Sequence, residues 1–306
     1  MGMRVLHFAC LSVGTAAMVA VLPATASGAS TPGRYTTIDV PGAVSTTPAG
    51  INDLGVIVGN YTDSSGNLYS YVDRDGKFVT IDDPSAPPFS TVAISINDSG
   101  VIGGAYYDTN GVPHGFIDRD GKFTTIDDPA GVDGTIAEIN NVGLIFGLYY
   151  DASGEVHGFT DRNSNFTTID APQGVDGTFI SWINDFGVIA GTYNDSSGNP
   201  VSYVDQGGTY TTISDPNAPP FSTFNSFIND FGVVVGAYVD AGGVDHGFTE
   251  LDGRYTSVDD PSAATESDAP YPQGTAAVAI NNLGVIVGFY FDSSGNAHGF
   301  ELSSGR

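Results

Sequence analysis

Short runs of β-branched and aromatic residues alternate with polar turns along most of the chain. Beyond the first 30 residues no segment has the 3.6-residue apolar period of an amphipathic helix. Turns rich in Asn, Asp and Gly, such as 97–100 and 118–121, separate the runs and suit the left-handed positions of tight hairpins. The turn 108–111 begins with Asp and ends with Gly, as type I turns do. One such stretch predicts four antiparallel strands, at residues 91–96, 101–107, 114–118 and 122–127.

The same pattern recurs six times along the chain. An Asn-x-x-Gly turn is followed in register by a second Gly, a Tyr and an Asp, and it begins at Asn52, Asn97, Asn140, Asn184, Asn229 and Asn281. An aromatic residue marks the fourth run of each unit, at Tyr35, Phe78, Phe123, Phe166, Tyr210 and Tyr255, with a period of roughly 44 residues. Four antiparallel strands per unit are the signature of a propeller blade. We therefore predict an all-β fold, a six-bladed β-propeller of four-stranded antiparallel blades.

The two ends of the repeat region predict how the ring closes. The first repeat motif, residues 34–40, is a fourth strand, whereas the last unit stops after a third strand at residues 298–302. The N-terminal strand is therefore expected to complete the last blade, which removes exposed sheet edges. Residues 83–91 return as residues 215–223, so blades one to three look duplicated as blades four to six.

The segment before the repeats has the form of a secretory signal. A charged start is followed by a largely apolar run over residues 5–22 and by a small-x-small pattern at residues 24–26. We expect residues 1–26 to be removed as a signal peptide, 27–33 to be a short linker and 34–306 to form a single propeller outside the cell. Cys10 is the only cysteine, so the exported chain has no disulfide and no thiolate metal site.

The chain is strongly acidic, with 9 Lys and Arg against 35 Asp and Glu and a net charge of −26 at pH 7. Binding to a phosphate backbone or to an anionic membrane surface needs clustered Lys and Arg. We therefore expect no nucleic-acid partner and no membrane insertion. Acidity of this kind either keeps an exported protein soluble or attracts cations.

The repeat motif resembles that of a known group of proteins. Ile-Asn-Asp-x-Gly-x-Ile-x-Gly followed by His-Gly-Phe is similar to the HAF-type bacterial extracellular repeat, named for His-Ala-Phe, over nearly all of residues 35–302. The departures are Gly115, Gly158, Gly247 and Gly299 in place of Ala, and the sequences Tyr-Ser-Tyr at 69–71 and Val-Ser-Tyr at 201–203. The resemblance implies an exported, propeller-like bacterial protein, and it brings no catalytic residue with it.

Two kinds of side chain are considered as metal ligands. The third strands open with His114, His157, His246 and His298. Different blades hold these histidines far apart, so we expect each to bond to a turn and to pack between blades rather than to share a metal ion. Calcium stays open as a cofactor, because the second turns offer carboxylates, although one turn supplies fewer than the ~6–8 oxygens that a calcium site needs. These weak metal candidates are Asp63, Asp108, Asp151, Asp195, Asp240 and Asp292.

Charge is expected to separate between the two ends of the ring. The first and third turns of every blade lie at one end of the ring. The second turns lie at the other end, together with the blade-to-blade connections, and we call this end the second-turn face. Lys and Arg fall at third turns, at Arg74, Lys77, Arg119, Lys122, Arg162 and Arg254, and Arg34 matches them in register. The second-turn face has the six aspartates above and Asp83, Asp128, Asp215 and Asp260, without Lys or Arg. We predict it to be strongly negative.

A ligand site is sought where the six repeats differ. Immediately before the repeated Ile of the inner strand stand Gly50, Ser95, Glu138, Trp182, Phe227 and Ala279. Glu138, Trp182 and Phe227 should meet on one side of the axis, where two aromatic rings and a carboxylate suit a sugar or a cationic ligand. Uneven filling of the core between blades is the alternative, and the residue types favour it. Tyr271 and the Pro-Pro-Phe loops at Phe89 and Phe221 would add aromatic surface to the second-turn face.

Three functions remain open from the sequence. There is no Gly-x-Ser-x-Gly, no His-Glu-x-x-His and no phosphate-binding Gly loop, so no catalytic residue is assigned. The first hypothesis is a monomeric, non-catalytic binding module that takes a cation, a glycan or a cell-surface partner through its acidic face. One alternative is a glycan hydrolase or lyase, with or without calcium, in which Glu138 or aspartates of the acidic face are the acid and base. The other is a structural or adhesive exoprotein.

Overall fold

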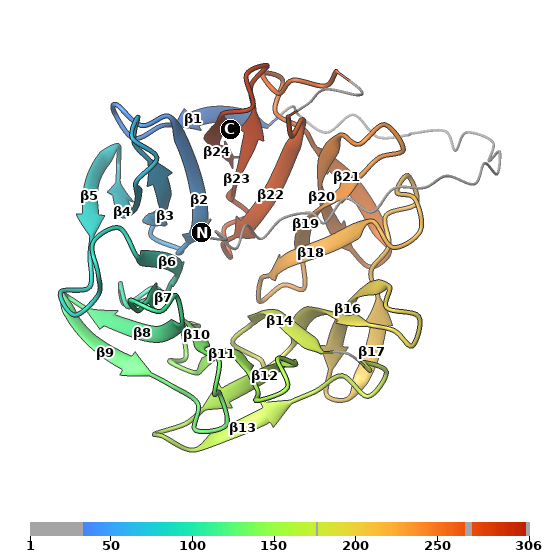
Figure 1. Ribbon diagram of the computed structural model, residues 1–306. Coiled ribbons are helices and arrows are strands. Elements are labelled where there is room, and N and C mark those ends of the chain that lie inside the picture. The colour runs from blue at the N-terminus through green and yellow to red at the C-terminus, as the bar shows by residue number, and fades with distance from the viewer. Residues whose placement is uncertain (1–32, 176, 267–270, 304–306) are drawn as a thin grey trace.

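Six four-stranded antiparallel sheets stand around a common axis in the computed structural model (Figure 1). The structure describes residues 33–175, 177–266 and 271–303, and strands are the only regular elements among them. The predicted six-bladed β-propeller is therefore confirmed. The described part of the chain has no helix that is long and apolar enough to cross a membrane. The predicted signal peptide and all but the last residue of the predicted linker lie outside the described residues.

Each blade is a meander whose first strand lies nearest the axis (Figure 1). Blade one consists of β2 (Ser45–Ile51), β3 (Ile57–Thr62), β4 (Leu68–Arg74) and β5 (Lys77–Ile81). Blade two consists of β6 (Thr91–Ile96), β7 (Ile102–Tyr107), β8 (Pro113–Arg119) and β9 (Lys122–Ile126). Blade three consists of β10 (Thr135–Ile139), β11 (Ile145–Tyr150), β12 (Val156–Asp161) and β13 (Phe166–Ile169).

The second half of the chain repeats this order. Blade four consists of β14 (Thr178–Ile183), β15 (Ile189–Asn194), β16 (Pro200–Gln206) and β17 (Thr209–Thr212). Blade five consists of β18 (Thr223–Ile228), β19 (Val234–Val239), β20 (Asp245–Leu251) and β21 (Arg254–Val258). Blade six consists of β22 (Thr275–Ile280), β23 (Ile286–Phe291), β24 (Ala297–Ser303) and β1 (Arg34–Ile38).

The ring closes through the two ends of the chain, as predicted. Strand β1 pairs antiparallel with β24, and the register brings Thr37 opposite Phe300. The N-terminal strand therefore supplies the fourth strand that the last unit of the sequence lacks. Every blade then has four strands, so neither end of the chain leaves an incomplete blade with an extra exposed edge.

Turn chemistry sets the strand ends. In blade two, Gly100 has a φ of 77°, and its N–H donates to the carbonyl oxygen of Asn97 at 2.9 Å. The third turn has left-handed Asp120 and Gly121, with φ of 53° and 81°, as a two-residue hairpin requires. The predicted and observed strands of this blade agree to within one residue at every end because these turns recur at constant spacing.

The second repeated glycine is explained by the core. A Cβ on Gly104 would clash with the carbonyl oxygen of Val92 on the inner strand and would lie 2.7 Å from the ring of Phe116, which is fully buried on the third strand. The equivalent third-strand residues are buried aromatics in all six blades: Tyr71, Phe116, Phe159, Tyr203, Phe248 and Phe300. The glycine therefore makes room for a large ring at the centre of each blade.

Candidate functional site

The repeated asparagines close a ring of hydrogen bonds around the axis; we call Asn52, Asn97, Asn140, Asn184, Asn229 and Asn281 the Asn belt. Each side chain is buried, and its Nδ2 donates to a backbone carbonyl oxygen of the next blade. Its Oδ1 accepts backbone N–H groups of its own turn, as Asn184 does from Phe186 and Val188. The last link runs from Nδ2 of Asn281 to the carbonyl oxygen of Asn52 at 3.0 Å. Asn is required here because Asp cannot donate.

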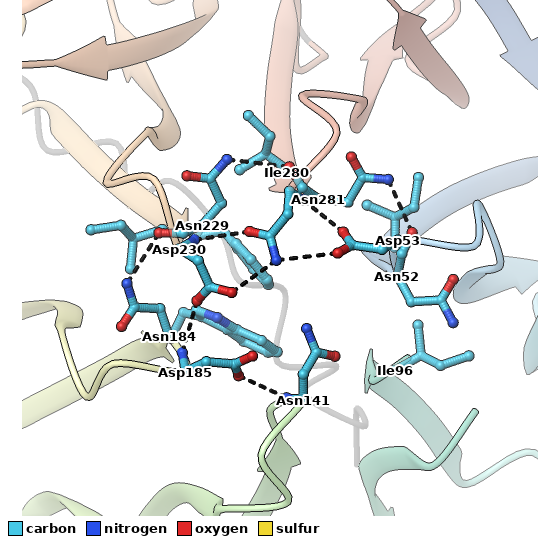
Figure 2. Close-up of a pocket in the computed structure, with 15 residues that line it drawn as sticks. Asn52, Asp53, Ile96, Asn141, Asn184, Asp185, Asn229, Asp230, Ile280 and Asn281 are labelled. Carbon is cyan, nitrogen blue, oxygen red and sulfur yellow. Dashed lines mark hydrogen bonds between the residues drawn. The ribbon is translucent and has the colours of Figure 1, made fainter. Parts of the chain in front are cut away.

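The residues that follow the belt form a second ring, which consists of Asp53, Asp98, Asn141, Asp185, Asp230 and Asn282. The backbone N–H of each one donates to the side-chain Oδ1 of its counterpart in the next blade. Figure 2 shows Asp53, Asp185 and Asp230 reaching from different blades towards the same central space, and the Asn282 amide donates to both Asp53 and Asp230. Burial, and then the nearby charge of Asp230, raise the pKa of Asp185. The first-turn end of the axis is thus lined by carboxylates and amides that tie neighbouring blades together.

A small cavity of ≈ 30 Å³ lies on the axis beside these rings (Figure 2). Trp182 and Phe227 both line it, and their rings stack at 3.9 Å between centroids with an interplanar angle of 24°. Phe146 meets Trp182 edge-on at 5.2 Å, and Trp182 is only 7% exposed. A water molecule needs about 10–15 Å³ of such a volume, and ligand pockets span about 300–1,000 Å³. The cavity is therefore the size of a few waters and has no room for a sugar ring.

Glu138 lies where the six inner strands differ most. The other five inner strands have a register shift in their pairing with the second strand, for example between Ala93 and Ser95, whereas β10 has none. Strand β10 is accordingly five residues long. Glu138 is 8% exposed and does not line the axial cavity. Burial raises the pKa of Glu138 to about 8, so the side chain is largely protonated at neutral pH.

Tyr271 lies far from the other three predicted ligand residues. A Cβ on Gly295, in the second turn of blade six, would lie 2.7 Å from Cβ of Tyr271. The tyrosine is therefore on the second-turn face, whereas the cavity beside Trp182 is lined by first-turn residues. The structure brings Trp182 and Phe227 together and places Tyr271, which is 52% exposed, at the opposite end of the ring.

The six second-turn aspartates each hold their own turn. Oδ1 of Asp63 accepts the N–H groups of Ser65 and Asn67, at 2.8 and 2.9 Å, and the other five repeat this arrangement. The side-chain and backbone hydrogen bonds from Asn67 lower the pKa of Asp63. Among the described residues, one group of Asp, Glu and His side chains has three ligand atoms within 4.8 Å of one another, and Asp151 is its one second-turn aspartate. Within the described ranges, the other five second-turn aspartates belong to no such group of three.

The four histidines bind aspartates of their own blade. Nδ1 lies 2.9 to 3.2 Å from a carboxylate just beyond the fourth strand, in the pairs His114–Asp127, His157–Asp170, His246–Asp259 and His298–Asp39. Each ring also stacks on the second-strand tyrosine, for example His157 on Tyr149 at 5.0 Å between centroids. The expected turn partner is present in three of these blades, where Nε2 lies 3.4 to 3.6 Å from the second-turn aspartate, in the pairs His157–Asp151, His246–Asp240 and His298–Asp292. The carboxylate beyond the fourth strand and the stacking within the blade are additional contacts that the sequence analysis did not predict. In blades two, three and five a constant spacing of 13 residues from His to Asp is the sequence signal that identifies this pair.

Blade one has an aromatic cluster on the second-turn face, where Tyr69 takes the place of the histidine. Tyr69 stacks on Tyr61 at 5.0 Å and 14°, and the ring of Phe89 meets it edge-on at 5.1 Å. The hydroxyl of Tyr69 donates to Oδ2 of Asp63 at 3.4 Å. We call Tyr61, Asp63, Tyr69 and Phe89 the aromatic platform. It combines exposed ring surface with a carboxylate acceptor.

Phe89 is held in a conformation that aromatic residues seldom adopt. Its φ is 65°, in the left-handed region, and the residue is 42% exposed. The preceding prolines and a hydrogen bond from the Ser90 hydroxyl to the carbonyl oxygen of Pro87, at 2.6 Å, define the loop. Phe221 in blade four has the same loop, with a φ of 62°, but Val201 stands at the position of Tyr69. Within the described chain Phe221 therefore lacks the aromatic partner that Phe89 has.

The predicted placement of basic residues agrees with the strand order. Every Lys and Arg among the described residues lies at a third turn or, for Arg34, at the matching start of β1 opposite Ser303. The second-turn face receives none of them. Asp83, Asp128, Asp215 and Asp260 on that face are buried, and each accepts a backbone N–H group two residues later.

Comparison with known proteins shows the fold. No protein family and no curated protein sequence matches the chain. A mutant of the Aleuria aurantia lectin in complex with Fucα1-6GlcNAc is similar, with a TM-score of 0.54 and 13% identity over 86% of this chain and 93% of that chain. TolB from Acinetobacter baumannii is similar with a TM-score of 0.53 and 14% identity, over 82% of this chain and 64% of that chain. At these identities the similarity extends to the propeller architecture and no further.

Proposed function

We propose that the protein is an exported, non-catalytic glycan-binding propeller that takes its ligand at the aromatic platform of blade one. The observation that carries this proposal is the exposure of Phe89 in a strained loop, beside the stacked rings of Tyr69 and Tyr61 and the carboxylate of Asp63. Backbone strain of this kind is retained where it serves a ligand or a switch. Aromatic surface with a few directed polar groups is the usual composition of a small-molecule site.

Charge restricts the class of glycan. The second-turn face carries aspartates and receives no Lys or Arg from the described residues. Sulfated, sialylated and uronic-acid sugars would meet like charge there, and like charge across an interface disfavours binding. The proposed ligand is therefore a neutral or amino-sugar glycan.

Two further observations support the proposal. A lectin with the same architecture has been solved in complex with a fucosylated disaccharide, which supports a glycan as the ligand class. The N-terminal segment with its small-x-small pattern, and the similarity of the repeats to the HAF-type extracellular group, support export to where glycans are met.

Binding to immobilised glycans tests the proposal. Residues 27–306 are labelled and applied to an array of neutral, amino and acidic glycans, and the strongest ligand is titrated by calorimetry. Phe89→Ala and Tyr69→Ala should each weaken binding at least tenfold. Phe221→Ala is the matched control, because it removes the same residue from the duplicated loop that lacks the aromatic partner, and it should bind like the wild type.

Three outcomes would overturn the proposal. The first is that no glycan is retained by a protein whose circular dichroism shows a folded ring. The second is that Phe89→Ala and Phe221→Ala weaken binding equally. The third is that the platform variants bind normally while Trp182→Phe does not, which would move the ligand to the axis.

A further inference from the structure

Blade three differs from the other blades at one position of its second turn. The residue four places after the second-turn aspartate is Asn67, Val112, Glu155, Asn199, Val244 or Asn296 in blades one to six. Where it is Asn, its Nδ2 donates to Oδ2 of the aspartate, at 2.9 Å in blade one, 3.1 Å in blade four and 3.2 Å in blade six. Blade three instead places a carboxylate beside Asp151. Two acceptors thus face each other where the other blades have a donor or an apolar side chain.

A histidine completes this cluster. The ligand atoms of Asp151, Glu155 and His157 all lie within 4.8 Å of one another, and all three residues are half-buried. Nε2 of His157 is 3.6 Å from Oδ2 of Asp151. In a tetrahedral site with bonds of ~2.0–2.1 Å, neighbouring ligand atoms lie ~3.4 Å apart. This pair is therefore already close to a coordinating separation, and a carboxylate oxygen of Glu155 lies within 4.8 Å of both ligand atoms.

The histidine is positioned independently of the two carboxylates that it faces. Its Nδ1 lies 2.9 Å from Oδ1 of Asp170, and its ring stacks on Tyr149. A carboxylate on Nδ1 holds the proton on that nitrogen and leaves the lone pair of Nε2 for a metal ion, which is the arrangement around most metal-binding histidines. Asp151 is likewise held through Oδ1, which accepts the N–H groups of Ser153 and Glu155 at 2.8 and 2.9 Å and leaves Oδ2 for a ligand.

We propose that Asp151, Glu155 and His157 bind one divalent transition-metal ion of the zinc type, with the fourth position open to water. One imidazole nitrogen and two carboxylate oxygens are a ligand set that suits zinc, whereas calcium takes ~6–8 oxygens and does not favour imidazole. Two carboxylates with a neutral imidazole balance the charge of such an ion. The site lies in blade three, does not use the aromatic platform, and does not depend on the proposed glycan function.

The duplicated blades supply matched variants for the test. Residues 27–306, freed of metal by a chelator that is then removed, are titrated with Zn²⁺ and separately with Ca²⁺ by calorimetry. One equivalent of zinc should bind, and calcium should not compete. Glu155→Val installs the residue of blade five and should weaken zinc binding at least tenfold. Val244→Glu gives blade five the full set with Asp240 and His246, and should add a second equivalent.

Two controls separate a built site from general binding by His–Asp pairs. Asn199→Val changes the same turn position in blade four, which has no histidine, and should leave the titration unchanged. In imidazole ¹⁵N spectra the first equivalent of zinc should shift Nε2 of His157 and not that of His114, His246 or His298. The proposal is overturned by the absence of a stoichiometric zinc ion, by wild-type affinity in Glu155→Val, or by equal shifts of all four histidines.

Discussion

Nδ1 of His298 lies 2.9 Å from Oδ2 of Asp39, although 259 residues separate the two along the chain. In blades two, three and five the same pair joins residues 13 apart. The N-terminal strand therefore reproduces in blade six the side-chain contact that the other blades form locally. Closure of the ring thus specifies a register as well as a strand pairing, because a one-residue slip would turn Asp39 to the other side of the sheet.

We expect Asp39→Asn to destabilise the ring more at low pH than at high pH. Burial alone would lower the pKa of His298, but the hydrogen bond and charge of Asp39 outweigh it and raise this pKa. A raised folded-state pKa stabilises the protein below the unfolded value of about 6.5, and this contribution is lost as pH rises through the folded value. Thermal unfolding at about pH 5.5 and about pH 8 measures the difference.

The size of this effect is limited by solvent. The side chains of His298 and Asp39 are 28% and 43% exposed, so the loss at low pH should be at most about 1 kcal/mol. In a His298→Phe background Asp39→Asn should lose its pH dependence. A midpoint lowered equally at both pH values in both backgrounds would contradict the assignment.

The Asn belt predicts a large cost for a small change. Asn184→Ala removes the donor to the carbonyl oxygen of Asn229 and the acceptor for the N–H groups of Phe186 and Val188. Buried polar groups left without partners cost about 1–3 kcal/mol each, so we expect a loss of roughly 2–4 kcal/mol in the free energy of unfolding. Urea denaturation measures it.

A second asparagine of the same blade is the control for this prediction. Asn199→Ala removes a partly buried amide whose one hydrogen-bond partner in the described part of the chain is Asp195 of its own second turn, and it should cost below about 1 kcal/mol. Equal losses in Asn184→Ala and Asn199→Ala would mean that the belt adds nothing beyond an ordinary turn.

Most of the fold could be predicted because one local rule is repeated. The Asn-x-x-Gly turn and the third-turn hairpin mark strand ends in every unit, and the unmatched strands at the two ends of the chain imply closure. The neighbourhood of Trp182 and Phe227 was also predictable from their equivalent positions on adjacent inner strands. The burial of the two rings could not be predicted, because it depends on the width of the central space between the inner strands, and the sequence does not give that width.

The features specific to single blades were harder to predict. The shortened inner strand that carries Glu138 is one residue shorter than its neighbours, a difference hidden by the variable length of the blade connections. The contact of each histidine with the aspartate beyond the fourth strand was not predicted, because only the turn was considered as a partner, and the turn aspartate is the second partner in three blades. Glu155 could not be singled out from the sequence because it ends a turn of ordinary composition, and its approach to Asp151 and His157 depends on the conformation of that turn.

Trp182 is expected to be a stability residue. Its ring is 7% exposed and packs between Phe146 and Phe227, so Trp182→Ala should destabilise the ring by about 3–5 kcal/mol. Because it is the only tryptophan, its fluorescence reports the inner core directly. Emission should lie at short wavelength in the folded protein and shift to long wavelength at the urea midpoint. Phe89→Ala is the control, because it changes an exposed loop and should leave that midpoint nearly unchanged. A Trp182→Ala protein as stable as the wild type would show that the stacked rings do not support the core.

The last prediction concerns Glu138 and the pH dependence of stability. Burial raises the pKa of Glu138 from 4.5 to about 8, so between these values the folded protein holds a proton that the unfolded chain has released. Stability then falls as pH rises, by up to about 1.4 kcal/mol per pH unit across that interval. Glu138→Gln mimics the protonated form and should abolish this decline, so that the variant matches the wild type near pH 4.5 and is more stable near pH 8.

Urea midpoints from about pH 4.5 to about pH 8.5 test this expectation. Asp252→Asn, at an exposed third turn, removes one negative charge without touching the interior and should keep the wild-type decline. A Glu138→Gln protein that still loses stability with the wild-type slope would mean that Glu138 is ionised in the folded ring. Its carboxylate would then need a charged or hydrogen-bonding partner at the axis, because an unpaired buried charge is too costly to persist.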